Sequence, residues 1–407
     1  MSDFFDPLEA RDPAVREAAL MAALPAQIAH AQSACTAYTE LLAGLDPRAI
    51  TSREALATLP LTRKSSLAAA QAARRSLRLG GFAADAPRRV FQSPGPLYEP
   101  EPEAEGGDPW RIGRALHAAG IRAGQLAHVG FSYHLTPAGA MMESGLRAIG
   151  AASFPGGVGN TELQVQAMLD LRPEAYAGTP SLLRILLEKA VEGGHALSLR
   201  QALVSGEACP PALVAWFAEH GVDVYQCYAT ADLGLIAYQT PAREGLVVDE
   251  GVIVEIVRPG TGDPLPDGEV GEVVVTTLSR GYPLIRFATG DLSAVMPGLS
   301  PCGRTNQRLR GWLGRADQSA KVRGMFVHAG QVAELIKRHP GVTRARLVIE
   351  GEMANDRMTL HAEAPAGLED ALAATLRDLT KLRGDIVLAA PGSLANDGKL
   401  IDDRRAL

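Results

Sequence analysis

The stretch that decides the fold is Gly281-Tyr282-Pro283-Leu284-Ile285-Arg286-Phe287-Ala288-Thr289-Gly290-Asp291-Leu292. A Thr-Gly-Asp triplet by itself is a common turn with exposed charges. Here it follows a β-branched run and an Arg-Phe pair. Two more segments rich in glycine and charge come after it, Gly311-Trp312-Leu313-Gly314-Arg315-Ala316-Asp317-Gln318 and Lys321-Val322-Arg323-Gly324. The ordered set is informative because its parts occur together.

Upstream of this stretch, short apolar runs alternate with segments of helical pattern. The expected strands are 126–129, 151–154, 175–177, 201–204 and 222–225, and the expected helices are 110–119, 138–149, 161–170, 180–191 and 210–220. Strands that alternate with helices in this way predict βαβ units and a largely parallel sheet.

The flanking regions differ in their predicted secondary structure. Residues 13–44 read as helix, and residues 252–257 and 271–277 read as strands because of their β-branched content. After residue 330, helices near 330–338 and 367–381 and strands at 344–350, 357–363 and 385–389 predict a small α+β domain. The predicted class is therefore α/β. A large N-terminal domain, 1–315, would hold mixed and parallel sheets, helices and a β-rich subdomain, and a hinge would join it to a small mobile domain, 316–407.

Two local expectations concern the N-terminal third. Residues 80–109 hold six prolines, five glycines and a run of carboxylates, which predicts an exposed, mobile loop. The turn Leu59–Lys64 is expected to open a short helix with Thr62 as its N-cap.

Composition excludes several classes. The net charge of -6 argues against a nucleic-acid scaffold. The sequence contains no uncharged apolar run of about 18 residues, so no membrane span is predicted. The acidic start does not resemble a signal peptide. Four cysteines without close pairs fit reduced thiols, so a cytoplasmic protein is expected.

The ordered set around Asp291 resembles the adenylate-forming superfamily of acyl-CoA synthetases, and most closely the phenylacetate-CoA ligase family. The resemblance implies that Asp291 accepts hydrogen bonds from the ribose hydroxyls of ATP, because a carboxylate offers two acceptor oxygens. It implies that Arg315 contacts ribose or phosphate and that Asp317 lies at the hinge.

A second segment, Tyr225-Gln226-Cys227-Tyr228-Ala229-Thr230-Ala231-Asp232-Leu233-Gly234, resembles the family pattern Tyr-Gly-x-Ser/Thr-Glu. The resemblance implies that Tyr228 stacks on adenine, that Thr230 bonds the α-phosphate and that Asp232 replaces the glutamate that helps to hold Mg²⁺. Ala229 replaces the glycine of the family pattern, and alanine is tolerated there only if its φ is negative. The nucleotide loop of the family falls on Ser205, Gly206 and Glu207.

Near the C-terminus, Asp397-Gly398-Lys399-Leu400 resembles the family's terminal Gly-Lys motif. It implies that Lys399 contacts the carboxylate and the α-phosphate during adenylation. A solvated lysine in a basic tail is the alternative. The path of coenzyme A would run past Lys321 and Gly324.

Two parts of the family pattern are weak here. The phosphate loop would fall on Val90–Pro100, where prolines remove backbone donors and no lysine follows, so that Ser93, Gly95 and Tyr98 are the candidate contacts. The aromatic-acid pocket would fall on Phe131, Tyr133 and His134, although a lone histidine at a strand end is more often structural. Cys302 resembles a zinc-knuckle position, but no second cysteine is near, so no metal is expected there.

The predicted function is an AMP-forming ligase. It would use ATP, Mg²⁺ and coenzyme A to activate a carboxylic acid of the aryl-acetic type and to pass it to the thiol. One alternative is adenylation followed by transfer to a carrier protein or an amine. Another is a divergent nucleotide- or acyl-CoA-binding protein with weak or lost catalysis. The expected partners are small molecules, with no nucleic acid and no membrane, and a homodimer is left open.

Overall fold

The computed structural model describes residues 4–93, 96–102, 107–316, 319–322, 325–351, 356–395 and 399–405. Its chain forms two compact units. Unit 1 comprises Met1–Val254, Val275–Phe287 and Met296–Gly311, and unit 2 comprises Glu255–Val274, Ala288–Val295 and Trp312–Leu407. The domain division predicted at residue 315 stays a prediction. Among the described residues, no helix combines the length and the apolar character that a membrane crossing requires.

The largest sheet has nine strands in the order β14-β15-β10-β9-β8-β7-β6-β4-β5. Strands β4 to β8 pair in parallel, whereas β9, β10 and β15 continue the sheet in antiparallel pairs. The strands are β4 (Leu126–Gly130), β5 (Ala152–Phe154), β6 (Ala175–Gly178), β7 (Gln201–Val204), β8 (Asp223–Thr230), β9 (Gly234–Tyr238), β10 (Leu246–Val248), β14 (Val295–Met296) and β15 (Arg308–Leu309). The predicted parallel sheet is thus confirmed for its first half.

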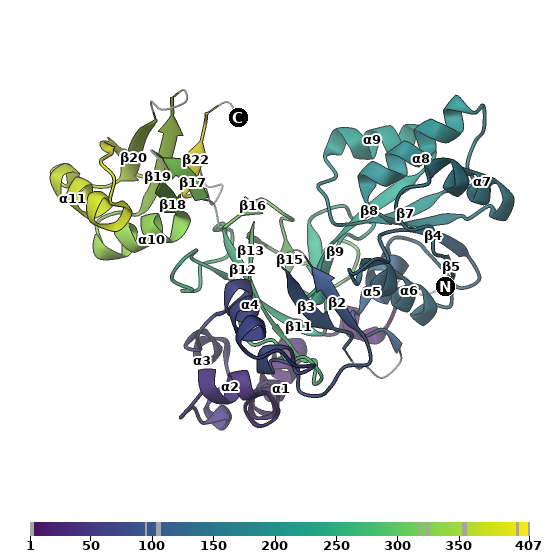
Figure 1. The fold of residues 1–407 in the computed structure, drawn as a ribbon, viewed down its shortest axis with the longest axis horizontal. Coiled ribbons are helices and arrows are strands. Elements are labelled where there is room, and N and C mark those ends of the chain that lie inside the picture. The colour runs from purple at the N-terminus through teal and green to yellow at the C-terminus, as the bar shows by residue number, and fades with distance from the viewer. Residues whose placement is uncertain are drawn as a thin grey trace. The chain divides into compact units, whose positions relative to one another are not determined.

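Helices cover both faces of this sheet, as Figure 1 shows. They are α5 (Ile112–Ala118) and α6 (Ala138–Ala148) on one face, and α7 (Thr161–Leu171), α8 (Pro180–Glu192) and α9 (Pro211–Glu219) on the other. The period-two alternation of the strands divides the core accordingly. Ala175 and Ala177 pack in the cluster that holds α5 and α6, while Tyr176 between them packs with α7 to α9.

A five-stranded sheet has the order β1-β13-β12-β11, with β16 beside β13. Its members are β1 (Thr62–Arg63), β11 (Val252–Val257), β12 (Gly271–Thr277), β13 (Phe287–Ser293) and β16 (Gly314–Arg315). Strands β11 to β13 each carry residues of both units. The Thr-Gly-Asp triplet lies within β13, so it is a strand segment and not an isolated turn.

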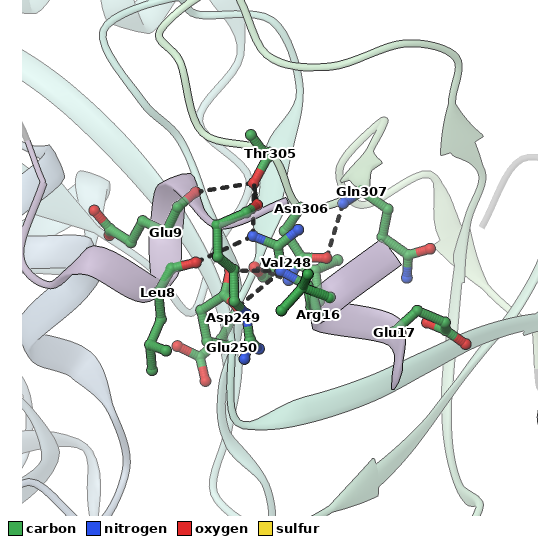
Figure 2. Close-up of polar contacts among 12 residues, drawn as sticks. Leu8, Glu9, Arg16, Glu17, Val248, Asp249, Glu250, Thr305, Asn306 and Gln307 are labelled. Atoms are coloured by element: carbon green, nitrogen blue, oxygen red, sulfur yellow. Dashed lines mark hydrogen bonds and ion pairs between the residues drawn. The ribbon is translucent and has the colours of Figure 1, made fainter. Parts of the chain in front are cut away.

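The N-terminal segment is fixed by charges that we call the N-terminal ion-pair network: the buried Glu9, Arg16, Glu250 and Arg304 and the half-buried Arg11. Arg16 donates from Nε to the Glu250 carboxylate at 2.8 Å and from Nη2 to Thr305 at 2.7 Å. Figure 2 shows Arg16 between Glu250, Thr305 and the Leu8 carbonyl. Burial of both partners makes these contacts part of the core, unlike surface ion pairs.

The other N-terminal helices are α1 (Pro13–Ala34), α2 (Thr36–Leu41), α3 (Arg53–Ala57) and α4 (Lys64–Ala73). The N-cap prediction for Thr62 is wrong. Thr62 lies in β1 and donates its hydroxyl to the Ile285 carbonyl at 2.7 Å, and Arg63 is the N-cap of α4. The helix starts only at Lys64 because Thr62 is paired in the sheet as part of β1.

The prediction of a plain loop at 80–109 is also wrong. The described part contains a hairpin of β2 (Val90–Ser93) and β3 (Leu97–Pro100), and the side chains of Leu97 and Glu99 are buried. The alternation of Leu97, Glu99 and the exposed Tyr98 is that of a strand with one covered face. Proline content hid that alternation in the sequence.

Unit 2 contains a four-stranded sheet in the order β21-β20-β19-β22. Its strands are β19 (Arg344–Glu350), β20 (Arg357–Glu363), β21 (Asp385–Ala389) and β22 (Ile401–Asp403), and α10 (Ala329–Arg338) and α11 (Glu369–Thr380) pack on it. The hairpin β17 (Ser319–Val322) and β18 (Met325–His328) precedes it. The small α+β arrangement matches the sequence expectation, and β22 was not expected.

Candidate active site

The predicted nucleotide loop follows β7 at the carboxyl edge of the parallel strands. Ser205 donates its hydroxyl to the Cys227 carbonyl at 2.8 Å, which ties the loop to β8. Gly206 has φ +81, and a Cβ there would lie 3.4 Å from the Phe131 ring. The structure therefore brings the loop of 205–207 together with Phe131, one wall of the predicted acid pocket, at the edge where open α/β sheets bind ligands.

Glu207 has a structural partner at this edge. Its carboxylate accepts from the Ser181 hydroxyl at 2.9 Å and from the Ser181 backbone N–H at 3.3 Å, in the first turn of α8. A carboxylate is favoured at a helix N-terminus. Glu207 thus positions the loop, and its predicted contact with nucleotide stays a prediction.

Close glycine packing shapes the floor below. A Cβ at Gly130 would lie 2.4 Å from the Tyr176 hydroxyl oxygen, and one at Gly178 would lie 2.2 Å from it. Gly130 and Gly178 are paired across β4 and β6. Only glycine at both positions leaves room for the buried Tyr176, and burial raises the pKa of this phenol well above its usual range.

The β8 motif is an extended strand with an irregularity between Tyr228 and Ala229. Because Ala229 lies within β8, alanine meets no positive-φ requirement there. The Thr230 hydroxyl accepts from the Leu233 backbone N–H at 3.2 Å, so it closes the turn toward Asp232. Counted from Tyr228, the hydroxyl position of the family pattern falls on Ala231, and Thr230 stands one residue before it.

Asp232 is paired with Lys64, a residue that the sequence did not indicate as part of the site. The Lys64 ammonium lies 2.9 Å from Asp232 Oδ2, and the Asp232 side chain is 0% exposed while that of Lys64 is 42% exposed. Asp232 Oδ1 has no hydrogen-bond partner within the described part of the chain. The carboxylate predicted to hold Mg²⁺ is therefore neutralised by a lysine from α4.

The predicted phosphate loop is the β2–β3 hairpin. Ser93 donates its hydroxyl to Glu99. Burial, followed by the negative charge of Asp232, raises the pKa of Glu99 to about 8. We call Lys64, Ser93, Glu99, Asp232 and the buried Tyr282 the α4–hairpin cluster. Gly95 lies outside the described residues, and the exposed Tyr98 contributes backbone contacts to Gln71.

The other two residues of the predicted acid pocket are more exposed than Phe131. Tyr133 donates to Glu143 at 3.0 Å, and a Cβ at Gly139 would lie 2.8 Å from its ring. Burial and the Glu143 charge raise the Tyr133 pKa. His134 is exposed. Its role at a substrate carboxylate stays a prediction.

Unit 2 holds the remaining nucleotide residues. Asp291 on β13 is opposite Arg315 on β16, and its Oδ1 accepts from Arg315 Nη1 at 3.2 Å and from Trp312 Nε1 at 3.0 Å. Gly290 has φ +76, and a Cβ there would lie 2.6 Å from the Arg315 guanidinium. The triplet therefore needs glycine so that arginine can reach the carboxylate, a reason that the sequence did not reveal.

Four other predicted residues are less informative. Asp317 and Gly324 lie outside the described residues, as does the side chain of Lys321. Lys399 is exposed, and its carbonyl accepts from Arg346 Nε at 3.2 Å beside β22. Among the residues with described positions, no group of three or more His, Cys, Asp or Glu side chains is arranged to hold a metal ion.

Comparison with known proteins identifies the family of the chain. A family model described as AMP-binding enzyme matches residues 141–282. A phenylacetate-coenzyme A ligase of Thermus thermophilus is 32% identical over 80% of this chain and 76% of its own length. One of Aromatoleum evansii is 29% identical over 79% and 74%.

A solved structure shares the architecture. A 2-hydroxyisobutyryl-CoA ligase in the postadenylation state has a TM-score of 0.74 and 25% identity, covering 99% of this chain and 93% of its own. The fold and these relatives define an adenylate-forming enzyme of the AMP-binding class. Within that class, the chain belongs to the phenylacetate-coenzyme A ligase family, which confirms the predicted fold class and resemblance.

Proposed function

We infer that this protein is an AMP-forming ligase that activates a carboxylic acid as an acyl-adenylate and transfers the acyl group to coenzyme A. The observation that carries this is family membership over most of the chain. The loop of 205–207 after β7, the β8 motif and Asp291 within β13 support it. An aryl-acetic type acid is the proposed substrate, because the named relatives are phenylacetate-coenzyme A ligases.

The proposed chemistry divides into two half-reactions. In the first, the substrate carboxylate attacks the α-phosphate of ATP, and pyrophosphate leaves. In the second, the thiol of coenzyme A attacks the acyl carbon, and AMP leaves. The protein would act through positioning and charge stabilisation. Asp291 and Arg315 would hold the ribose, and residues 316–407 would turn about Asp317 between the two steps.

Mg²⁺ would accompany the phosphates of ATP. Among the described residues neither Asp232 oxygen has a hydrogen-bond partner, and a carboxylate oxygen suits a hard cation. Its Oδ2 lies 2.9 Å from the Lys64 ammonium as an ion pair. The ion would therefore share this carboxylate with the lysine ammonium and neutralise charge on the phosphates.

A pyrophosphate-release assay tests the proposal. The full chain is given ATP, Mg²⁺ and a panel of aryl and alkyl acids, with and without coenzyme A, and thiol consumption is followed in parallel. Acid-dependent release with loss of free thiol is the expected result. Release without thiol consumption would identify an adenylating enzyme with another acceptor. ATP binding without release for any acid would identify a nucleotide-binding protein instead.

A further inference from the structure

The turn between β8 and β9 contains Asp232 and is held by the two residues that precede α5. Arg111 Nη2 donates to the Leu233 carbonyl at 2.6 Å and to the Leu235 carbonyl at 3.0 Å. The Leu235 N–H in turn donates to the Trp110 carbonyl at 2.9 Å. Two neighbouring residues therefore hold three backbone groups on the C-terminal side of Asp232.

The guanidinium of Arg111 is itself fixed by a buried carboxylate. Its Nε donates to Asp249 Oδ1 at 2.9 Å, and the Asp249 side chain is 0% exposed while that of Arg111 is 18% exposed. Asp249 directly follows β10 and also accepts from Arg114 Nη1 at 2.8 Å. A planar guanidinium can meet three acceptors in fixed directions, which an ammonium cannot do. The turn is therefore tied to the end of β10 as well as to α5.

The backbone of Arg111 is strained. Its φ is +63, in the left-handed region that residues with a Cβ rarely adopt. Glycine would take the same conformation without this strain. A strained residue persists where its surroundings over-determine it, and such residues gather at functional sites. Here the strained residue is the one whose side chain holds the turn of Asp232.

The turn has little freedom to adjust. Gly234 has φ +73, and a Cβ there would lie 2.8 Å from the Trp110 carbonyl oxygen. The buried Asp232 carboxylate accepts no hydrogen bond from any residue that the structure describes. Its position therefore depends on the backbone of the turn and on the ion pair with Lys64.

We propose that Arg111 is a positioning residue for adenylation, because it fixes the β8–β9 turn so that the Asp232 carboxylate faces Mg²⁺ and the phosphates of ATP. This inference rests on the proposed function, since Asp232 acts there. Arg111 touches neither substrate nor metal in this scheme, and no bond is made or broken at it. A misplacement of about 1 Å can cost on the order of 10²-fold in rate, so a residue that acts only through the turn can still control the chemistry.

Hydrogen exchange followed by mass spectrometry tests the hold on the turn, on the full chain without any ligand. Arg111→Gln removes both bonds to the turn carbonyls, while Arg114 keeps its bond to Asp249. The peptide 230–236 should then exchange about tenfold faster or more, since hydrogen bonds from charged groups are the strong ones. Arg114→Gln is the matched control, because it also removes one partner of Asp249 but no bond to the turn. Its exchange at 230–236 should stay within about twofold of the wild type.

The same variants are compared in acyl-AMP formation. In Arg111→Gln, kcat should fall about tenfold or more, and the Mg²⁺ concentration that gives half the maximal rate should rise. Arg114→Gln should stay within about twofold in both quantities, although it also loses the ion pair with Asp6 and should unfold at an equal or lower temperature. A loss of stability alone therefore cannot produce the expected pattern.

A conservative variant covers the case in which Arg111→Gln does not fold. Arg111→Lys keeps a charge beside Asp249 but not the fork of donors, so the peptide 230–236 should still exchange faster than in the wild type. Wild-type exchange at 230–236 in the folded Arg111 variant, or the same increase in Arg114→Gln, would overturn the proposal.

The two measurements separate this inference from the proposed function. If exchange at 230–236 rises in Arg111→Gln but the wild type releases no pyrophosphate with any acid, the proposed function fails while the hold of Arg111 on the turn stands. If the wild type is active and Arg111→Gln exchanges faster with unchanged kcat and Mg²⁺ dependence, Arg111 is merely structural and this inference alone fails.

Discussion

The N-terminal ion-pair network and the α4–hairpin cluster are both buried sets of charges in unit 1, yet they are built differently. In the network, both oxygens of Glu250 accept from arginines, and both oxygens of Glu9 accept from Tyr238, Arg304 or the Phe5 N–H. In the cluster, Glu99 and Asp232 each keep a buried oxygen without a partner in the described structure. Buried polar atoms without a hydrogen-bond partner among the described residues occur in both sets, for example Arg11 Nε and Arg16 Nη1 in the network, so the two sets differ in how fully their carboxylates are paired.

The largest expected effect would break the network. Glu250→Ala leaves Arg16 buried without its carboxylate, which should lower the free energy of unfolding by about 3–5 kcal/mol. Urea denaturation followed by circular dichroism measures this. Glu188→Ala, at an exposed pair with Arg184, is the control and should cost less than about 1 kcal/mol. Equal losses in the two variants would show that the network is no more than a surface feature.

The next effect concerns Lys399, which is expected to move with the small domain. Lys399→Ala should slow acyl-AMP formation by a factor on the order of 10², the usual loss when one charge-stabilising donor is removed. Thioester formation from supplied acyl-AMP should be nearly unchanged, because the small domain is expected to have turned by then. Lys381→Ala, an exposed lysine of the same unit, is the control.

Two outcomes of the half-reaction measurement would count against that scheme. If both half-reactions fall equally, Lys399 is structural or the two-conformation scheme is wrong. If neither falls, the motif around Lys399 resembles the family pattern by chance.

A smaller effect tests the protonation of the cluster. The pKa of Glu99 is raised to about 8, so its folded form holds a proton that the unfolded chain releases near pH 4.5. Stability should therefore fall as pH rises from about 4.5 to about 8 and level off above that range. Glu99→Gln removes this loss, and its gain over wild type should grow between pH 5 and pH 8 by at most about 4 kcal/mol, since one pKa unit corresponds to about 1.4 kcal/mol.

Glu101→Gln is the internal control for that series. The hydrogen bond from Arg89 lowers the Glu101 pKa, so this carboxylate stabilises the fold above its unfolded pKa. The variant should lose a little stability at neutral pH and none at pH 3. A Glu99→Gln gain that is constant with pH would show that Glu99 is ionised in the folded protein.

The smallest effect concerns the second unit. Trp312→Phe removes the hydrogen bond from Trp312 to Asp291 Oδ1, while Arg315 keeps its own. AMP affinity should fall by about three- to tenfold, the range of a single net hydrogen bond, when measured by calorimetry. Asp291→Ala should abolish AMP binding. Unchanged affinity in Asp291→Ala would remove this carboxylate from the site.

The sequence determined the class and the order of the elements. The alternation of apolar strands and helices between residues 110 and 225 predicted the parallel sheet, because each strand and helix must bury one face and the period shows which. The set around Asp291 predicted the family, since threonine, glycine and carboxylate follow one another directly in the sequence. The pairing of Asp291 with Arg315 also joins residues that the sequence had placed in one motif.

Only the tertiary structure decided which charges meet. Lys64 and Asp232 are far apart in the chain, and nothing in either local sequence reveals that α4 and the end of β8 come together. The hairpin at 90–100 was hidden for a similar reason, because the backbone of β3 bonds to Gln71 of α4 and not to neighbours in sequence. Local patterns fix secondary structure through backbone sterics and amphipathic period, whereas ion pairs and buried carboxylates depend on distances and desolvation, which exist only once the chain has folded.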